Sequence, residues 1–147
     1  MGRLNEAAAD LEKALELNPD IWHGHVFVSR ICIMQKRPQD ALPEIGHIQE
    51  GDWRLIEYAL AYWALGRKKE ADTVLNELTA KYQAIDPYEI AEVYAFRNQP
   101  DKAFEWLDRA YAQHDPGLME TRVDPLLKNL HNDQRYVSLL RKLNLPT

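Results

Sequence analysis

Two histidines and one cysteine are the first candidates for metal chemistry. His23 and His25 stand two positions apart, which places their side chains about 200° apart around a helix. A metal site needs several ligands that converge on one point, and no carboxylate stands at helical i+4 spacing from either histidine. Cys32 is the only cysteine, so an internal disulfide is impossible. The sequence predicts no metal site, with both histidines on the surface.

The acidic residues show no catalytic pattern. The chain has 23 Asp and Glu residues, which fall at expected helix caps or on expected solvated helix faces. Glycine-rich phosphate loops, nucleophile elbows and zinc-protease motifs are all missing from the sequence. We therefore predict that the protein is not an enzyme and that it needs no cofactor.

Composition narrows the classes of partner. Apolar residues make up 46% of the chain and charged residues 28%, with a formal net charge of −5, which is typical of a globular protein rather than a disordered one. The acidic balance argues against a general nucleic-acid binder, because phosphate binding needs a concentrated basic surface. No apolar run approaches the roughly 20 residues of a membrane span, and the N-terminus lacks the apolar core of a signal peptide. We expect a cytoplasmic protein without nucleic-acid or membrane partners.

Helical periodicity runs along the chain. Leu4, Leu11 and Leu15 fall on one face of a helix that ends at Asn18-Pro19. Similar patterns predict helices at about residues 21–35, 38–50, 52–65, 67–82, 86–97, 101–113, 124–130 and 134–143. The helix at 52–65 is strongly apolar, and we expect it to be the most buried. The aspartates that we expect to act as N-caps are Asp20, Asp52, Asp86, Asp124 and Asp133. Nothing alternates with period two, so no strand is expected.

Alanines recur at a nearly constant spacing. They are separated by 34, 30 and 32 residues, and they are Ala7, Ala41, Ala71 and Ala103. Each follows a turn residue by five positions, and these turn residues are Gly2, Lys36, Gly66 and Asn98. Three of the four tolerate a positive φ angle, whereas the lysine replaces the expected glycine. Small residues at a fixed period allow paired helices to pack closely, so the pattern indicates a repeat of helix pairs.

Residues 2–116 resemble the tetratricopeptide repeat (TPR) family through this period and these turns. The resemblance implies an all-α fold, a right-handed superhelical array of antiparallel helix pairs with C-terminal capping helices. We expect a single domain over residues 1–147, with a half unit at 2–19, units at about 20–51, 52–83 and 84–116, and a cap at 117–147. Residues 124–146 are similar to the closing segment of TPR regions in bacterial multidomain regulators. The chain is therefore also expected to be the C-terminal part of a larger regulatory protein.

The resemblance also implies a function. TPR arrays are protein-interaction scaffolds that bind peptides in a groove lined by the first helix of each pair. The residues that map to this concave face are Phe27, Arg30, Trp53, Glu57, Leu60, Tyr88, Glu89 and Glu92. This aromatic and acidic face suits an apolar segment of basic or neutral character.

The half unit suggests a different function. Its stripe of Leu4, Leu11 and Leu15 lacks the partner helix that would cover it. The alternative prediction is therefore self-association through this face, which would give a homodimer. In that case the protein is a homotypic assembly module.

Overall fold

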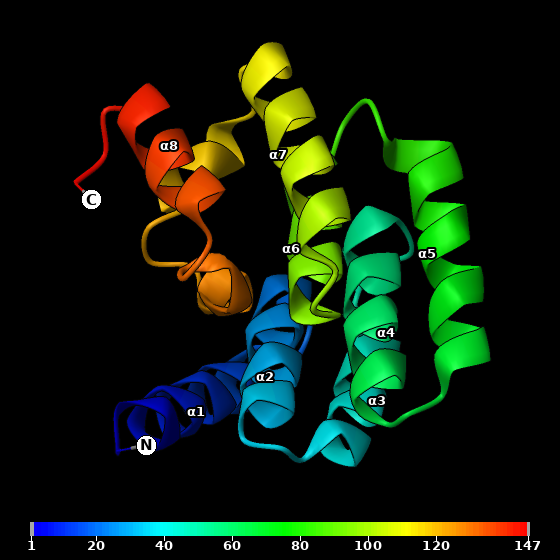
Figure 1. Ribbon diagram of the computed structural model, residues 1–147. Helices are drawn as coiled ribbons and strands as arrows, with labels where there is room; N and C mark the ends of the chain where they lie inside the picture. The colour runs from blue at the N-terminus through cyan, green and yellow to red at the C-terminus, as the bar shows by residue number, and fades with distance from the viewer. Residues whose placement is uncertain (1, 147) are drawn as a thin grey trace. The chain divides into compact units, whose positions relative to one another are not determined.

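All of the regular secondary structure in the described part of the chain is helical. The computed structural model describes residues 2–146, although the side chains of residues 2–5, 7 and 12 lie outside the description. The elements are α1 (Gly2–Leu17), α2 (Trp22–Met34), α3 (Pro38–Gly46), α4 (Asp52–Ala64), α5 (Lys68–Tyr82), α6 (Pro87–Phe96), α7 (Pro100–Gln113), the 3₁₀ helices η1 (Pro116–Glu120) and η2 (Pro125–Leu130), and α8 (Gln134–Lys142) (Figure 1). Within residues 2–146 no strand occurs, so the predicted all-α class is confirmed.

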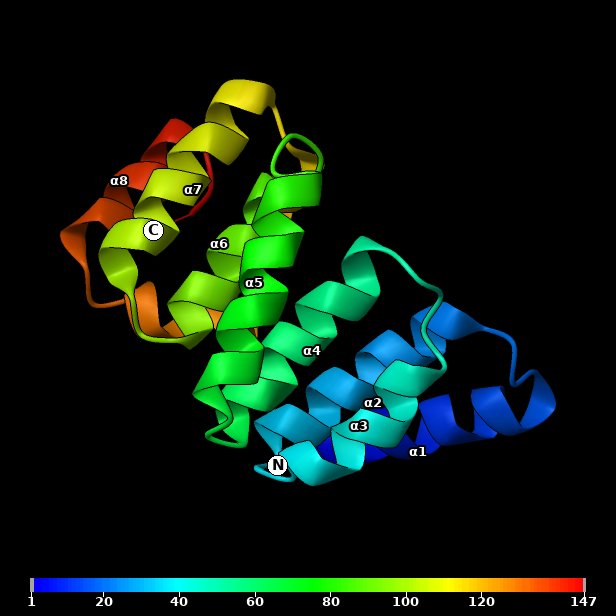
Figure 2. The same ribbon diagram turned by 90° about the vertical axis from the view of Figure 1, so that its right-hand side faces the viewer.

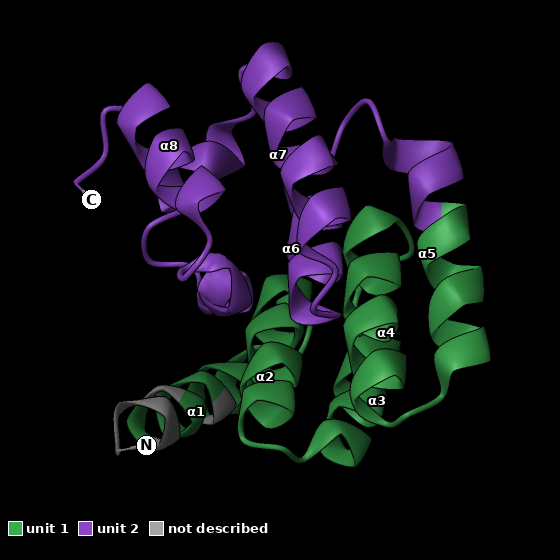
Figure 3. Ribbon diagram, in the orientation of Figure 1, with its two compact units in different colours: residues 1–77 green, residues 78–147 purple. Residues whose placement is uncertain are grey.

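The chain divides into two compact units. Unit 1 comprises residues 1–77 and unit 2 comprises residues 78–147 (Figure 3). The division falls inside α5. The single domain, the boundaries of the repeat units and the superhelical arrangement of the whole array stay predictions.

In unit 1 each helix packs against its neighbour in the sequence. Helix α2 packs against α1 and α3, and it also contacts α4, the first helix of the next pair (Figures 1 and 2). Its position among three helices explains why most of its side chains are buried, Val28, Ile31 and Cys32 among them. Contacts from one pair to the next through first helices are typical of stacked helical repeats.

The alanine period marks close helix contacts. Ala41, Ala71 and Ala103 are fully buried, whereas the side chain of Ala7 is outside the description. Two small residues on other helices, Ser29 of α2 and Ala91 of α6, are fully buried too. Residues without a bulky side chain therefore occupy the closest approaches, as the repeat pattern predicts.

The turns between paired helices share one backbone conformation. Gly66 has a φ angle of 74°, and Lys36 and Asn98 take the same left-handed conformation with φ angles of 61° and 56°. Lys36 adopts this conformation although it carries a Cβ atom, which glycine lacks. At Lys36 the backbone therefore keeps the conformation of the repeat, although the sequence lacks the expected glycine.

In unit 2 helix α6 is the central element. It packs against α7, η1 and η2, and seven of its ten residues are buried. Only five of the thirteen residues of α4 are buried, so the expectation that residues 52–65 form the most buried helix is wrong. The apolar residues of α4 include Trp53, Tyr58 and Trp63, which are only half-buried.

Some helix ends also differ from the sequence-based expectation. Asp20 does not cap α2, because the N-cap position is Ile21 and no side chain bonds to that helix end. The expected caps at Asp52 and Asp86 are also wrong, because Asp52 lies inside α4 and the Asp86 side chain forms no cap bond to α6. Asp124 and Asp133 do cap, each accepting a backbone N–H bond. Residues 125–130 form a 3₁₀ helix rather than an α-helix. Helix α3 ends at Gly46, before the expected end near residue 50.

Candidate interaction site

A buried ion pair connects α2 and α4 in unit 1. Glu57 is fully buried, and its carboxylate accepts hydrogen bonds from Ser29 Oγ and from Arg30 Nε, each at 2.7 Å. The Arg30 guanidinium lies 5.6 Å from the centre of the Trp53 ring. A buried charge is tolerated only with such partners. Glu57 therefore offers no accessible negative charge, although the sequence suggests an acidic surface here.

Phe27 of α2 is a large apolar side chain that lies mostly in solvent. It is 56% exposed, although both of its neighbours, Val26 and Val28, are buried. Leu60, by contrast, is fully buried in α4. The predicted groove residues of unit 1 thus divide into an exposed aromatic, the half-buried Arg30 and Trp53, and two residues of the interior.

In unit 2 the predicted groove residues have mainly structural surroundings. Tyr88 is buried; its backbone N–H donates to Asp115 Oδ2 at 3.2 Å, and its hydroxyl donates to Asp124 Oδ2 at 3.0 Å. Burial, and then the neighbouring Asp124 and Glu92 carboxylates, raise the pKa of Tyr88 far above its usual value. Glu92 is buried as well, so Glu89 is the only one of these three residues that is partly exposed.

Polar bonds hold the C-terminal segment of unit 2 together. Asp124 accepts the N–H of Leu126 in addition to the hydroxyl of Tyr88, and the Tyr136 hydroxyl donates to the backbone oxygen of Thr121 at 2.8 Å. Burial raises the pKa of Tyr136. The sequence signal for this cluster is Asp124-Pro125, which predicts a cap but not the tyrosine bonded to it.

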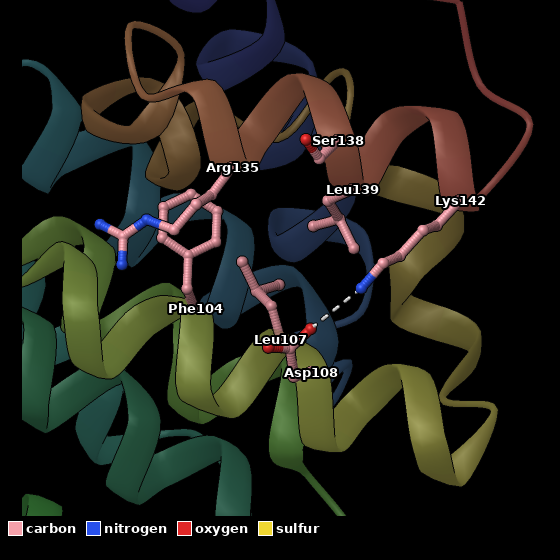
Figure 4. Close-up of a pocket in the computed structure, with 7 residues that line it drawn as sticks. All are labelled: Phe104, Leu107, Asp108, Arg135, Ser138, Leu139 and Lys142. Carbon is pink, nitrogen blue, oxygen red and sulfur yellow. Dashed lines mark ion pairs between the residues drawn. The ribbon is translucent and has the colours of Figure 1, made fainter.

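A small cleft lies between α7 and α8 (Figure 4). It has a volume of about 120 Å³ with Leu107 and Leu139 among its lining residues. Lys142 Nζ lies 3.6 Å from Asp108 Oδ1 at one end, and the Arg135 guanidinium lies 4.4 Å from the centre of the Phe104 ring at the other.

The cations beside this cleft already have acidic partners. Arg135 bonds to Asp133 at 2.7 Å and to Asp101 at 2.9 Å. These bonds raise the pKa of Arg135 and lower that of Asp133. Lys142 is likewise paired with Asp108. We therefore interpret the cleft as part of the packing between α7 and α8 rather than as an anion-binding site.

The two histidines differ in environment. His23 is exposed, as expected, but His25 is buried, so the expectation of a surface position for His25 is wrong. Its Nδ1 lies 2.7 Å from Glu44 Oε2 and its Nε2 lies 3.2 Å from the backbone oxygen of Pro19. The residue joins α2 to α3 and to the turn before α2. Among residues with described side chains, no group of three potential ligands is arranged to hold a metal ion.

The predicted self-association face is partly covered within the chain. A Cβ atom added to Gly24 of α2 would lie 2.8 Å from Leu15 Cδ2, so Leu15 packs directly against that helix. Leu15 is therefore not an uncovered residue, because α2 supplies part of the expected partner surface. Leu11 is half-buried, and the side chain of Leu4 lies outside the described residues.

Comparison with known proteins supports the repeat assignment. Residues 1–21 match the family model of the tetratricopeptide repeat. Residues 1–21 are therefore similar to one tetratricopeptide repeat. Members of the TPR family are generally non-catalytic scaffolds that bind proteins or peptides. No curated protein and no solved structure matches the chain. No helix in the described part is both long enough and apolar enough to span a bilayer.

Proposed function

We propose that the protein is an interaction scaffold that binds a peptide segment through unit 1, with Phe27 as the anchor. The proposed binding face consists of the exposed Phe27 and the half-buried Arg30 and Trp53. The proposal rests on one observation, the 56% exposure of Phe27 on a helix whose neighbouring residues are buried. Large aromatic side chains with a nearby arginine are the residues that dominate binding energy at protein interfaces.

The chemistry of the face favours an apolar or aromatic partner side chain. The Glu57 carboxylate is buried and bonded to Ser29 and Arg30. It is therefore not accessible to select a basic peptide. The Trp53 ring and the guanidinium near it offer a planar surface suited to stacking. The proposed ligand is therefore a short segment with at least one aromatic or long aliphatic side chain and no strong positive charge.

Peptide display tests this function directly. Random 12-residue peptides are selected on the wild-type protein, and their affinities are then measured for the wild type and for Phe27→Ala. Removal of a residue that dominates an interface costs about 2 kcal/mol or more, so we expect affinity to fall by more than about tenfold.

The matched control is Ile85→Ala, which removes another exposed apolar side chain, in the turn before α6. The selected peptides should bind this variant as they bind the wild type. Equal binding to Phe27→Ala and the wild type would place the site elsewhere. Tyr88 and Glu92 are unsuitable probes, because both are buried and their replacement would disturb the fold.

The regulatory role within a larger multidomain protein and the homodimer remain proposals. Self-association through the predicted stripe now depends on Leu4 and Leu11, because Leu15 packs against Gly24. The structure favours Phe27 over that stripe as an interaction site, since Leu11 is only partly accessible.

A further inference from the structure

An open groove on the C-terminal segment of unit 2 has an apolar floor and a basic rim. It has a volume of about 480 Å³, and its lining residues are Arg122, His131, Tyr136, Val137, Leu140 and Pro146. Arg122 and His131 are exposed, whereas Leu140 is buried in the floor. The groove is distinct from the Phe27 face and takes no part in the proposed peptide binding.

The charge of this segment is opposite to that of the rest of the chain. Residues 116–147 contain five Lys and Arg against three Asp and Glu, a net charge of +2, whereas residues 1–115 contain 13 against 20, a net charge of −7. Two of the three acids in the segment are engaged, because Asp124 is buried and bonded to Tyr88 and Asp133 is bonded to Arg135. Two of the five cations, Arg135 and Lys142, are paired as well, whereas the Arg122 side chain at the rim is exposed. The rim therefore favours a ligand that carries carboxylates.

The N-terminal helix carries a surface of complementary chemistry. Glu6, Asp10, Ala14 and Leu17 follow an i, i+4, i+8, i+11 spacing on α1 and are all exposed. Leu17 is 88% exposed, a high value for a leucine on a helix. This acidic stripe consists of two carboxylates, a small residue and one aliphatic side chain, and it differs from the Leu4, Leu11 and Leu15 stripe.

We propose that the basic groove of one molecule binds the acidic stripe of a second copy, with Leu17 against the apolar floor and the carboxylates of Glu6 and Asp10 toward Arg122 and His131. Two different surfaces meet in this contact, so the association is head-to-tail and can continue beyond a dimer. Salt weakens it, because its orientation depends on exposed charges.

Sedimentation velocity over a concentration series tests the contact. The wild-type protein should associate at low salt and less at high salt. Arg122→Glu should weaken association by about tenfold, and Leu17→Ser should weaken it by at least as much. Both residues are exposed, so each variant should keep the circular dichroism spectrum and melting temperature of the wild type.

Mixing the two variants decides between head-to-tail and symmetric contacts. Leu17→Ser keeps an intact groove and Arg122→Glu keeps an intact stripe, so an equimolar mixture should form a 1:1 complex that neither variant forms alone. A mixture that stays monomeric while the wild type associates would overturn the proposal in favour of a symmetric interface. A wild-type protein that remains monomeric up to about 1 mM at low salt would also overturn it. Phe27→Ala should associate like the wild type, which separates this result from that of the peptide experiment.

Discussion

Tyr88 is a single residue that connects α6 to the C-terminal segment through both its backbone and its hydroxyl. The sequence places it at the start of a helix and suggests a groove position, because aromatic residues in first helices often line the concave face of a repeat. The structure gives it a buried position, with Asp124 as its partner 36 residues later. A partner so distant in sequence is not visible in any local pattern.

Removal of the Tyr88 hydroxyl should lower stability and change its pH dependence. Tyr88→Phe leaves a buried oxygen of Asp124 without this donor, and we expect a loss of about 1–3 kcal/mol at neutral pH in urea unfolding. The pKa of Tyr88 is raised in the folded state. Its contribution is thus complete below the unfolded pKa of about 10 and is lost as the pH rises above that value.

The wild type should therefore lose stability above about pH 10 more steeply than Tyr88→Phe does. The matched control is Tyr111→Phe, since Tyr111 is exposed, and it should follow the wild-type pH profile. Equal slopes for the wild type and Tyr88→Phe would contradict the buried hydroxyl bond.

Glu57 shows the same limit of sequence reasoning in unit 1. The sequence places its carboxylate on the predicted groove face, whereas the structure buries it completely. Its two partners lie on the preceding first helix, 27 and 28 residues earlier, so only packing reveals that the charge is satisfied. The sequence predicts Phe27 as a groove residue, but it does not show how much of the side chain is exposed.

At the scale of elements, the turn before α3 contains a residue with a strained backbone conformation. Lys36 adopts a φ angle of 61° where the repeat normally carries glycine. The left-handed conformation costs a residue with a Cβ atom roughly 1–2 kcal/mol. We expect Lys36→Gly to raise the free energy of unfolding by up to about 1 kcal/mol, because part of the gain is lost to the greater freedom of glycine in the unfolded chain.

The reverse substitution provides the matched control for this turn. Gly66→Ala at a φ angle of 74° should destabilise the protein, although an added Cβ atom would meet nothing within 4 Å. Both effects can be measured by thermal and urea unfolding. A Lys36→Gly variant less stable than the wild type would show that the lysine side chain contributes more than the strain costs.

Element type and order follow from the sequence because the helical periodicity is strong and proline or glycine stands near most boundaries. The predicted helices all occur, mostly within one or two residues of the expected ends. The predictions that fail concern details that depend on tertiary structure. The N-cap position of α2 is Ile21 rather than Asp20, and residues 125–130 form a 3₁₀ helix capped by Asp124.

At the scale of the whole molecule, the position of the division between the two units is informative. It falls within α5, whereas domain boundaries usually fall in flexible segments rich in proline, glycine or polar residues. We therefore expect calorimetry to show one unfolding transition, with the calorimetric and van't Hoff enthalpies in agreement. Two resolved transitions would contradict the predicted single domain.

The buried contact of Glu57 with Ser29 and Arg30 has a consequence for how this protein changes over time. Loss of Arg30 alone leaves the buried Glu57 charge without its ionic partner, which costs about 3–5 kcal/mol, and loss of Ser29 removes a further hydrogen bond, whereas replacement of the whole group by apolar residues can be neutral. We therefore expect substitutions at these three positions to occur together during evolution. Relatives of this chain should carry either all three polar residues or none, and a designer who moves this helix pair to another repeat must transfer them together.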